Sequence, residues 1–195
     1  MPSKTEATRA RILQASLDLL EKSGGKGVRV SDIAKRAGLT RQALYLHFAN
    51  RADLLIATTL YLDRLKGADA RLAKSRAART GLERLNAFVT AWGGYIPEIY
   101  GCAKALIAMG DGDDVAKATW DKRMQDMREG CRAAVDALIA DNDLNPAHDA
   151  KIATDILWAM LSVQNWERWT LDCGWSQEEY IKNLKWMAVN LIVKT

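Results

Sequence analysis

Residues Val28–Phe48 combine hydrogen-bonding side chains with a glycine corner, in the order V-R-V-S-D-I-A-K-R-A-G-L-T-R-Q-A-L-Y-L-H-F. Arg41 can donate two parallel hydrogen bonds to the O6 and N7 atoms of guanine, and Gln42 can form the equivalent pair with adenine. The hydroxyl groups of Thr40 and Tyr45 suit phosphate oxygens. The chemistry that this stretch predicts is therefore recognition of DNA base edges and of the phosphate backbone.

Three further polar residues complete the expected contact set. Ser31 is expected to cap a short helix, where its hydroxyl and the free backbone N–H groups would bind a phosphate. Arg51 would meet another phosphate at the start of a later helix. The expected DNA-binding residues are Ser31, Thr40, Arg41, Gln42, Tyr45, His47 and Arg51. Two alternatives remain: Tyr45 and His47 merely cover the small domain, or the segment is a helical hairpin with no DNA role.

Two short helices and a tight turn must position these side chains. The pattern predicts helices over residues 32–37 and 41–47, joined at Gly38, which readily adopts the left-handed conformation that a sharp corner needs. The small side chain of Ala34 would let the helices cross closely, and Leu44 would fill the core beneath them. This is the spacing of a helix-turn-helix, whose second helix enters the major groove.

The rest of the chain also reads as helical. Apolar periodicity and breaks at glycine and proline predict further helices over residues 5–23, 51–74, 80–96, 97–109, 113–141, 146–172 and 176–193. Asn50, and Ser176 with Glu179, are expected N-terminal caps. We expect an all-α protein of about nine helices. A three-helix DNA-binding domain in residues 1–50 would precede a helical ligand-binding and dimerisation domain in residues 51–195.

Basic residues are concentrated at the start of the chain. Residues 1–50 hold nine Lys or Arg and four Asp or Glu, and the whole chain carries a formal net charge of +4. The remaining residues are therefore close to neutral. A basic head on a near-neutral body is typical of a protein that binds a polyanion, although charge alone would also fit a membrane surface.

The run from Ile12 to Leu55 closely resembles the TetR/AcrR family of transcriptional regulators. The matching elements are R-A-R-I-L-Q-A-S-L-D-L-L (Arg9–Leu20), the stretch Gly27–Phe48 and N-R-A-D-L-L (Asn50–Leu55). Arg51 departs from the family, which usually has lysine there, but it keeps the charge. The resemblance implies a homodimer, an all-helical fold of nine or so helices and a ligand cavity in the C-terminal part.

All seven tryptophans lie outside the first 50 residues. Aromatic and methionine side chains with a few polar groups are what a pocket for a small apolar or aromatic effector needs. The expected pocket residues are Trp92, Tyr95, Ile99, Trp120, Met124, Met127, Trp158, Leu161 and Asn165. Binding of an organic cation to the aromatic faces is an alternative, and so is a solid core that these side chains simply fill.

The last two predicted helices carry more apolar residues than one core needs. We expect the surplus to form a four-helix dimer interface that includes Ile156, Met160, Trp186 and Val189. Such a homodimer would hold two recognition helices about one DNA turn or more apart, and so would bind a near-palindromic double-stranded DNA operator.

Other classes of protein find no support in the residue pattern. Cys102, Cys131 and Cys173 are odd in number and far apart, which argues against a disulfide framework or a zinc site. The stretch 141–152 fails as a calcium loop, because its sixth position is Pro146. We expect no cofactor, no metal, no enzymatic constellation, no membrane span and no signal peptide, and hence a soluble cytoplasmic protein.

These features together predict a ligand-responsive DNA-binding transcriptional regulator. The expected mode of action is repression, relieved when a small apolar or aromatic effector releases the protein from its operator. The alternative is an architectural DNA-binding regulator with a solid core and no small-molecule ligand.

Overall fold

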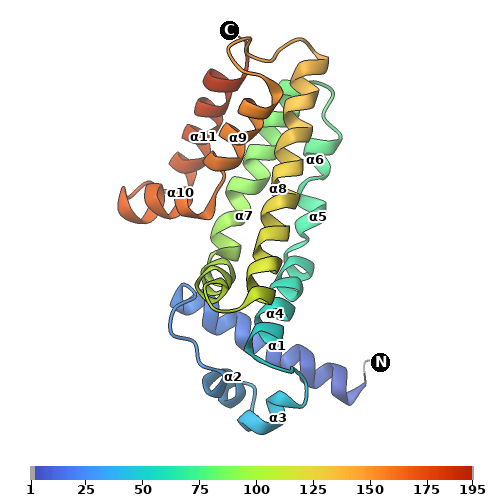
Figure 1. Ribbon diagram of the computed structural model, residues 1–195, viewed down its shortest axis with the longest axis vertical. Helices are drawn as coiled ribbons and strands as arrows, with labels where there is room; N and C mark the ends of the chain where they lie inside the picture. The colour runs from blue at the N-terminus through green and yellow to red at the C-terminus, as the bar shows by residue number, and fades with distance from the viewer. Residues whose placement is uncertain (1–2, 195) are drawn as a thin grey trace. The chain divides into compact units, whose positions relative to one another are not determined.

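The computed structural model describes residues 3–194, and within that range the chain is all-helical apart from one isolated bridge between Leu144 and Val193. This confirms the expected fold class (Figure 1). The helices are α1 (Lys4–Ser23), α2 (Val30–Arg36), α3 (Arg41–Tyr45), α4 (Arg51–Lys66), α5 (Ala68–Arg71), α6 (Ala73–Arg76), α7 (Gly81–Gly110), α8 (Asp114–Ala140), α9 (Ala150–Met160), α10 (Val163–Glu167), the π-helical η1 (Arg168–Asp172) and α11 (Gln177–Ile192).

The helices form two compact units. The first comprises the chain up to Gly67 together with Glu98–Lys122, and the second comprises Ala68–Pro97 together with the chain from Arg123 onward. The unit that contains the helix-turn-helix is thus larger than residues 1–50. The functional division at residue 50 stays a prediction.

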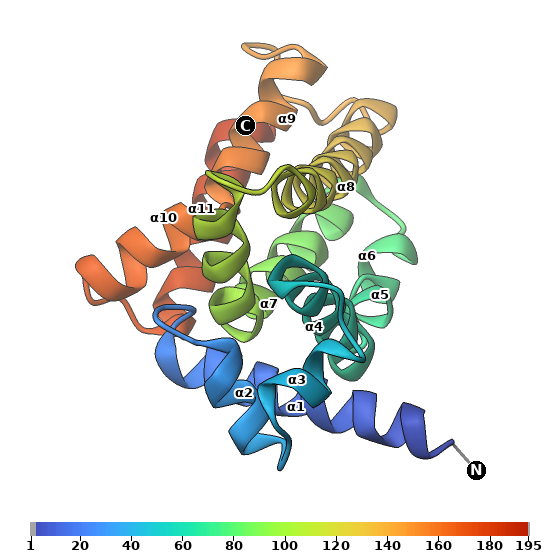
Figure 2. The ribbon, with the colours of Figure 1, turned by 60° about the horizontal axis from the view of Figure 1, so that its bottom comes forward.

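In the first unit, α1 lies across α2 and α4, and α3 lies beside α2 (Figure 2). The sequence begins α1 with a capping box, in which the Ser3 hydroxyl accepts the Glu6 N–H and the Glu6 carboxylate accepts the Ser3 N–H. Its predicted apolar stripe, which includes Ile12 and Leu20, is buried. The hydroxyls of Ser16 and Thr58 lie 3.0 Å apart and join α1 to α4 inside this core.

Gly101 of α7 also belongs to the first unit, and it lies against the backbone of α1. A Cβ atom built at Gly101 would lie 2.4 Å from the Leu20 carbonyl oxygen and 2.7 Å from its carbon. No side chain fits at such distances, so glycine is required where these two helices touch.

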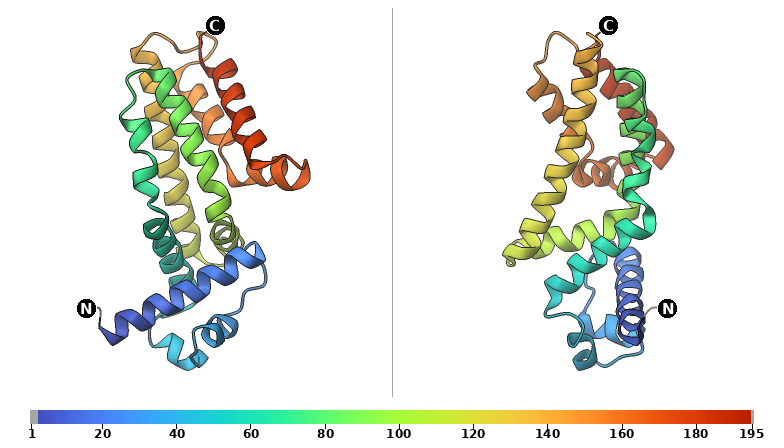
Figure 3. Two further views of the ribbon diagram at one scale, coloured as in Figure 1. Left: turned by 180° about the vertical axis from the view of Figure 1, so that it is seen from behind. Right: turned by 90° about the vertical axis from the view of Figure 1, so that its right-hand side faces the viewer.

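In the second unit, α9 and α11 run alongside the N-terminal part of α7 (Figure 3). The predicted break at Pro97 is wrong, because α7 continues through this residue. Proline lacks the N–H that would bond to the carbonyl of Gly93, and an unpaired carbonyl normally makes an interior proline costly. Here the Gln177 side-chain amide donates to the Gly93 oxygen at 2.7 Å, and the Gln177 carbonyl accepts the Trp166 indole N–H at 2.9 Å.

Two other predicted helices are shorter than expected. The helix expected over 51–74 ends at Lys66, because Gly67 adopts a left-handed conformation with a φ of 60°. The helix expected over 146–172 begins only after its cap Asp149, and a second cap, Ser162, starts α10 as a separate helix. The predicted caps Asn50 and Ser176, the latter with Glu179, are confirmed.

Candidate nucleic-acid interface

A glycine corner joins α2 to α3, as the sequence predicts. Gly38 has a φ of 69°, and a Cβ there would meet no atom within 4 Å, so its conformation rather than crowding requires glycine. The Leu39 N–H reaches back to the Ala34 carbonyl at 2.9 Å and closes the turn. Ala34 and Leu44 are buried beneath the corner.

The recognition helix α3 is short and has a capped N-terminus. The Thr40 hydroxyl accepts the Ala43 N–H at 3.1 Å, which stabilises the first turn and leaves the hydroxyl hydrogen free to donate. Arg41 and Gln42 follow immediately and are exposed. The Arg41 guanidinium carbon lies 5.5 Å from the centre of the half-buried Tyr45 ring, so cation–π attraction helps to orient it. This arrangement presents both expected base-reading side chains to solvent.

Two residues near α3 have roles that sequence reasoning missed. Arg9 of α1 donates to the His47 carbonyl, and its guanidinium carbon lies 4.1 Å from the centre of the Phe48 ring. Arg9 therefore anchors the chain just after α3. Leu46 is 86% exposed. Its position, two residues after the buried Leu44, could have indicated this, and an apolar side chain at this place suits the methyl group of thymine.

Ser31 and Arg51 differ from their expected geometry. The cap residue of α2 is Arg29 and the helix begins at Val30, so the predicted capping role of Ser31 is wrong, although its hydroxyl is exposed. The buried Val30 side chain accounts for this earlier start. Arg51 is exposed, but its guanidinium donates to the Val28 carbonyl at 3.3 Å. It also lines a cavity of about 520 Å³ that includes Lys26 and Lys104.

The expected effector residues do not all fall in one unit. Ile99 and Trp120 belong to the first unit, and the other seven belong to the second. There Trp92 lies between Phe88 and Tyr95, with ring centres 6.4 and 5.9 Å away. Of the other expected pocket residues in that unit, Met127 and Leu161 are buried, whereas Met124, Trp158 and Asn165 are half-buried.

The expected pocket residues also differ in whether their side-chain donors already have a hydrogen-bond acceptor. The Trp158 indole donates to the Met124 carbonyl at 3.1 Å, and the Asn165 amide donates to the Ala159 carbonyl at 2.7 Å. By contrast, Trp92 Nε1 is buried without a partner among residues 3–194. Trp92 therefore keeps an unused donor, whereas Trp158 and the Asn165 amide already have a backbone acceptor.

Tyr180 is a second buried donor without a partner in the described range, and sequence reasoning missed it. Its side chain is fully buried, and burial raises the pKa of the phenol, which stays neutral as a result. A Cβ built at Gly93 would lie 3.6 Å from a carbon of the Tyr180 ring. Because Trp92 precedes Gly93 in the chain, two unused donors occur close to one turn of α7.

The expected dimer residues have unequal exposure. Trp186 is 64% exposed, and the neighbouring helix α9 presents Ile152 at 44%. Ile156 and Val189 are half-buried. Met160 is only 8% exposed, so it contributes to the core of its own chain and offers little surface to a partner.

The geometry defines a helix-turn-helix protein, and known proteins share its N-terminal segment. Residues 12–58 match the family described as bacterial regulatory proteins, tetR family. The transcriptional regulator TtgR of Pseudomonas putida is 34% identical over 82 residues, which is 42% of this chain and 38% of TtgR. The regulator AcrR of Shigella flexneri is 39% identical over 51 residues, or 26% of this chain and 24% of AcrR. The chain thus matches well under two thirds of the length of these curated relatives.

Solved structures extend the likeness of fold to nearly the whole chain. A protein from Saccharomonospora viridis, solved in complex with choline, superposes with a TM-score of 0.83 at 18% identity over 97% of this chain and 100% of its own. A TetR transcriptional regulator from Chloroflexus aurantiacus has a TM-score of 0.74 at 22% identity over 98% and 99%. The N-terminal segment is thus similar to the tetR family, and the fold of the whole chain is similar to solved structures of TetR regulators.

Proposed function

We propose that the chain is a DNA-binding transcriptional regulator, which acts as a homodimer and binds a near-palindromic operator. The observation that carries the proposal is the exposed pair Arg41 and Gln42 in the first turn of a capped helix, within a segment that matches the tetR family. Side chains at this place in a helix-turn-helix face base edges.

Substitution of Arg41 and of Arg51 by alanine tests this role. DNA duplexes selected from a random pool by the wild-type protein supply the operator, and binding is measured at several salt concentrations. Arg41→Ala is expected to lose discrimination between selected and random duplexes by roughly 5- to 150-fold per half-site, since a paired contact contributes about 1–3 kcal/mol. Arg51→Ala is expected to weaken binding to all duplexes and to reduce the salt slope by about one per lost phosphate contact.

A matched control comes from another exposed arginine of the same unit. Arg36 forms an ion pair with Asp18, and its guanidinium lowers the pKa of that carboxyl. Arg36→Ala should preserve the preference for selected duplexes, because this guanidinium is already paired with Asp18 of α1. If Arg41→Ala and the control behaved alike, α3 would not be the reading helix.

We further propose that the second unit binds a small effector that relieves repression. The unused donors of Trp92 and Tyr180 support this idea, because buried donors without acceptors are uncommon in a solid core. They favour an effector that brings an acceptor oxygen to an aromatic site. The choline complex of the Saccharomonospora viridis protein shows that one protein of this fold takes a small organic cation with a hydroxyl group. An architectural role without a ligand would leave both donors unexplained.

Tyr180→Phe distinguishes an effector-binding second unit from an architectural protein with a solid core. Without ligand, removal of an unpaired buried hydroxyl should raise the free energy of unfolding by about 1 kcal/mol. With choline as the probe, the same change should weaken binding about 2- to 12-fold, the loss of one neutral hydrogen bond. Thermal unfolding and tryptophan fluorescence titration measure the two effects.

The hydroxyl of Tyr61 provides the control, because it already donates to Gln14 at 3.1 Å in the first unit. Tyr61→Phe should leave choline binding unchanged and should not stabilise the fold. A loss of stability in Tyr180→Phe would mean that its hydroxyl already has an acceptor, and the effector proposal would lose its main support.

A further inference from the structure

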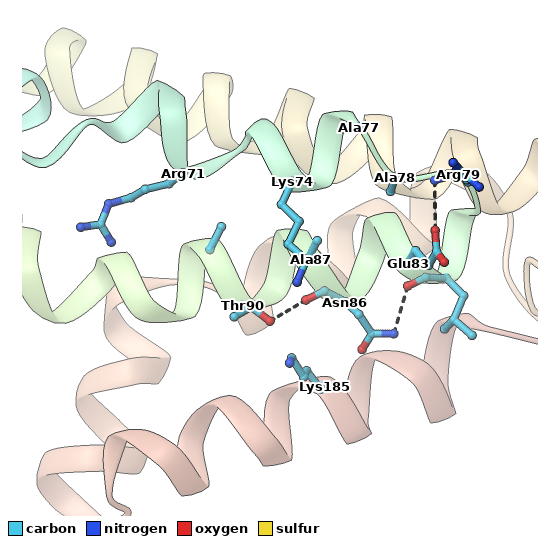
Figure 4. Close-up of a pocket in the computed structure, with 12 residues that line it drawn as sticks. Arg71, Lys74, Ala77, Ala78, Arg79, Glu83, Asn86, Ala87, Thr90 and Lys185 are labelled. Atoms are coloured by element: carbon cyan, nitrogen blue, oxygen red, sulfur yellow. Dashed lines mark hydrogen bonds between the residues drawn. The ribbon is translucent and has the colours of Figure 1, made fainter.

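A groove of about 900 Å³ lies on the second unit between α6, α7 and α11, and none of the expected effector residues lines it (Figure 4). Alanines form much of its floor, joined by Leu82, which is exposed to solvent. Asn86 and Thr90 of α7 add polar groups. This volume falls in the range of small-molecule sites.

Four basic side chains border this groove: Arg71, Lys74, Arg79 and Lys185. In Figure 4, Lys74 extends from α6 toward α7, and Lys185 extends from α11 toward the same stretch. The guanidinium of Arg71 lies 4.9 Å from the Tyr95 ring centre at one end. Lys74 and Lys185 therefore come from separate helices, whereas Arg71 and Arg79 lie at opposite ends of the groove.

The groove has little negative charge of its own. Glu83 is the acidic residue among its lining residues, and this carboxylate accepts the Arg79 backbone N–H at 3.0 Å, near the start of α7. Within residues 3–194, no carboxylate pairs with Lys74 or Lys185. Some basic side chains elsewhere on this unit do pair with acids, as Arg132 does with Asp136 at 2.7 Å.

We propose that this groove binds a small amphipathic anion, whose carboxylate or phosphate lies between Lys74 and Lys185 and whose apolar chain lies on the alanine floor. Unpaired cations that share one space repel each other, and an anion between them removes that repulsion while gaining charge-assisted hydrogen bonds. The apolar floor adds burial of the chain. Neither a bare inorganic anion nor a neutral hydrocarbon would use both features.

The probe for the test is 11-(dansylamino)undecanoic acid, whose fluorescence rises in an apolar site, with its methyl ester as the uncharged counterpart. The acid is expected to bind the full-length protein and the ester to bind at least about 10-fold more weakly. The double variant Lys74→Gln/Lys185→Gln should lose about 10-fold or more in affinity for the acid. Displacement by dodecanoate and by dodecyl phosphate shows which head group is preferred.

Lys182 is the matched control, because it is exposed on the same helix and does not line the groove. Lys182→Gln should bind the acid like wild type, and so should Tyr180→Phe, which alters the separate effector proposal. Equal binding of acid and ester, wild-type affinity in the double variant, or displacement by duplex DNA as effective as that by dodecanoate would each overturn the proposal. Circular dichroism of the double variant confirms its fold.

Discussion

Gly101→Ala is expected to lower the free energy of unfolding by about 2–3 kcal/mol, the upper part of the range for an overpacked core. The added methyl group would lie 2.4 Å from the Leu20 carbonyl oxygen, which is backbone and so cannot rotate away. The same oxygen also accepts the Gly25 N–H at 2.9 Å, so a displaced Leu20 would disturb the end of α1 as well. Thermal unfolding should show a melting temperature lower by roughly 5–10 °C.

Gly94 offers a control in the same helix. A Cβ at this position meets no atom within 4 Å, so Gly94→Ala should raise stability by about 0.5–1 kcal/mol through its better helix propensity. Similar stability losses in both variants would show that helix propensity, not contact with α1, sets the cost at Gly101.

Trp186→Glu is expected to convert the proposed dimer to a monomer. The indole is 64% exposed on α11, as Ile152 is on α9 at 44%, and an isologous interface would contain the charge twice. Loss of a central tryptophan in an interface commonly costs 2 kcal/mol or more, and the two carboxylates add to that, so the dissociation constant should rise at least about 100-fold. Sedimentation velocity at micromolar concentration measures it.

Affinity for the operator should depend on dimer formation. A monomer holds one recognition helix, so Trp186→Glu should also lose most of its affinity for a two-half-site operator. Leu171→Glu is the matched control, since this leucine is 57% exposed on η1, outside α9 and α11. If the dimer persisted in Trp186→Glu but dissociated in Leu171→Glu, the interface would lie around η1 and not on α11.

Local signals account for what the sequence predicted well. The helix-turn-helix depends on a cap at Thr40, a left-handed glycine at Gly38 and apolar spacing, all of which act within a few residues. The family resemblance over Ile12–Leu55 agrees with the matched segment 12–58. The exposure of Arg41 and Gln42 follows from the same spacing.

Features that depend on distant residues escaped prediction. The break expected at Pro97 is wrong because the Gln177 side-chain amide, 84 positions from Gly93, donates to the Gly93 carbonyl in place of the N–H that proline lacks. The basic groove unites Lys74 and Lys185, which no local pattern connects. Pocket residues were predicted by residue type alone, and type does not distinguish Trp158, whose indole donor is used, from Trp92, whose donor is not.

The bond between Gln177 and the Gly93 carbonyl has a consequence for how this sequence can vary. With alanine at position 97, the backbone N–H would return and compete with the Gln177 amide for the same oxygen. The Trp166 indole, which donates to the other end of that amide, would then lose a fixed partner. Positions 97, 166 and 177 therefore form a set in which a change at one alters the changes that the other two tolerate, so they should co-vary among related chains.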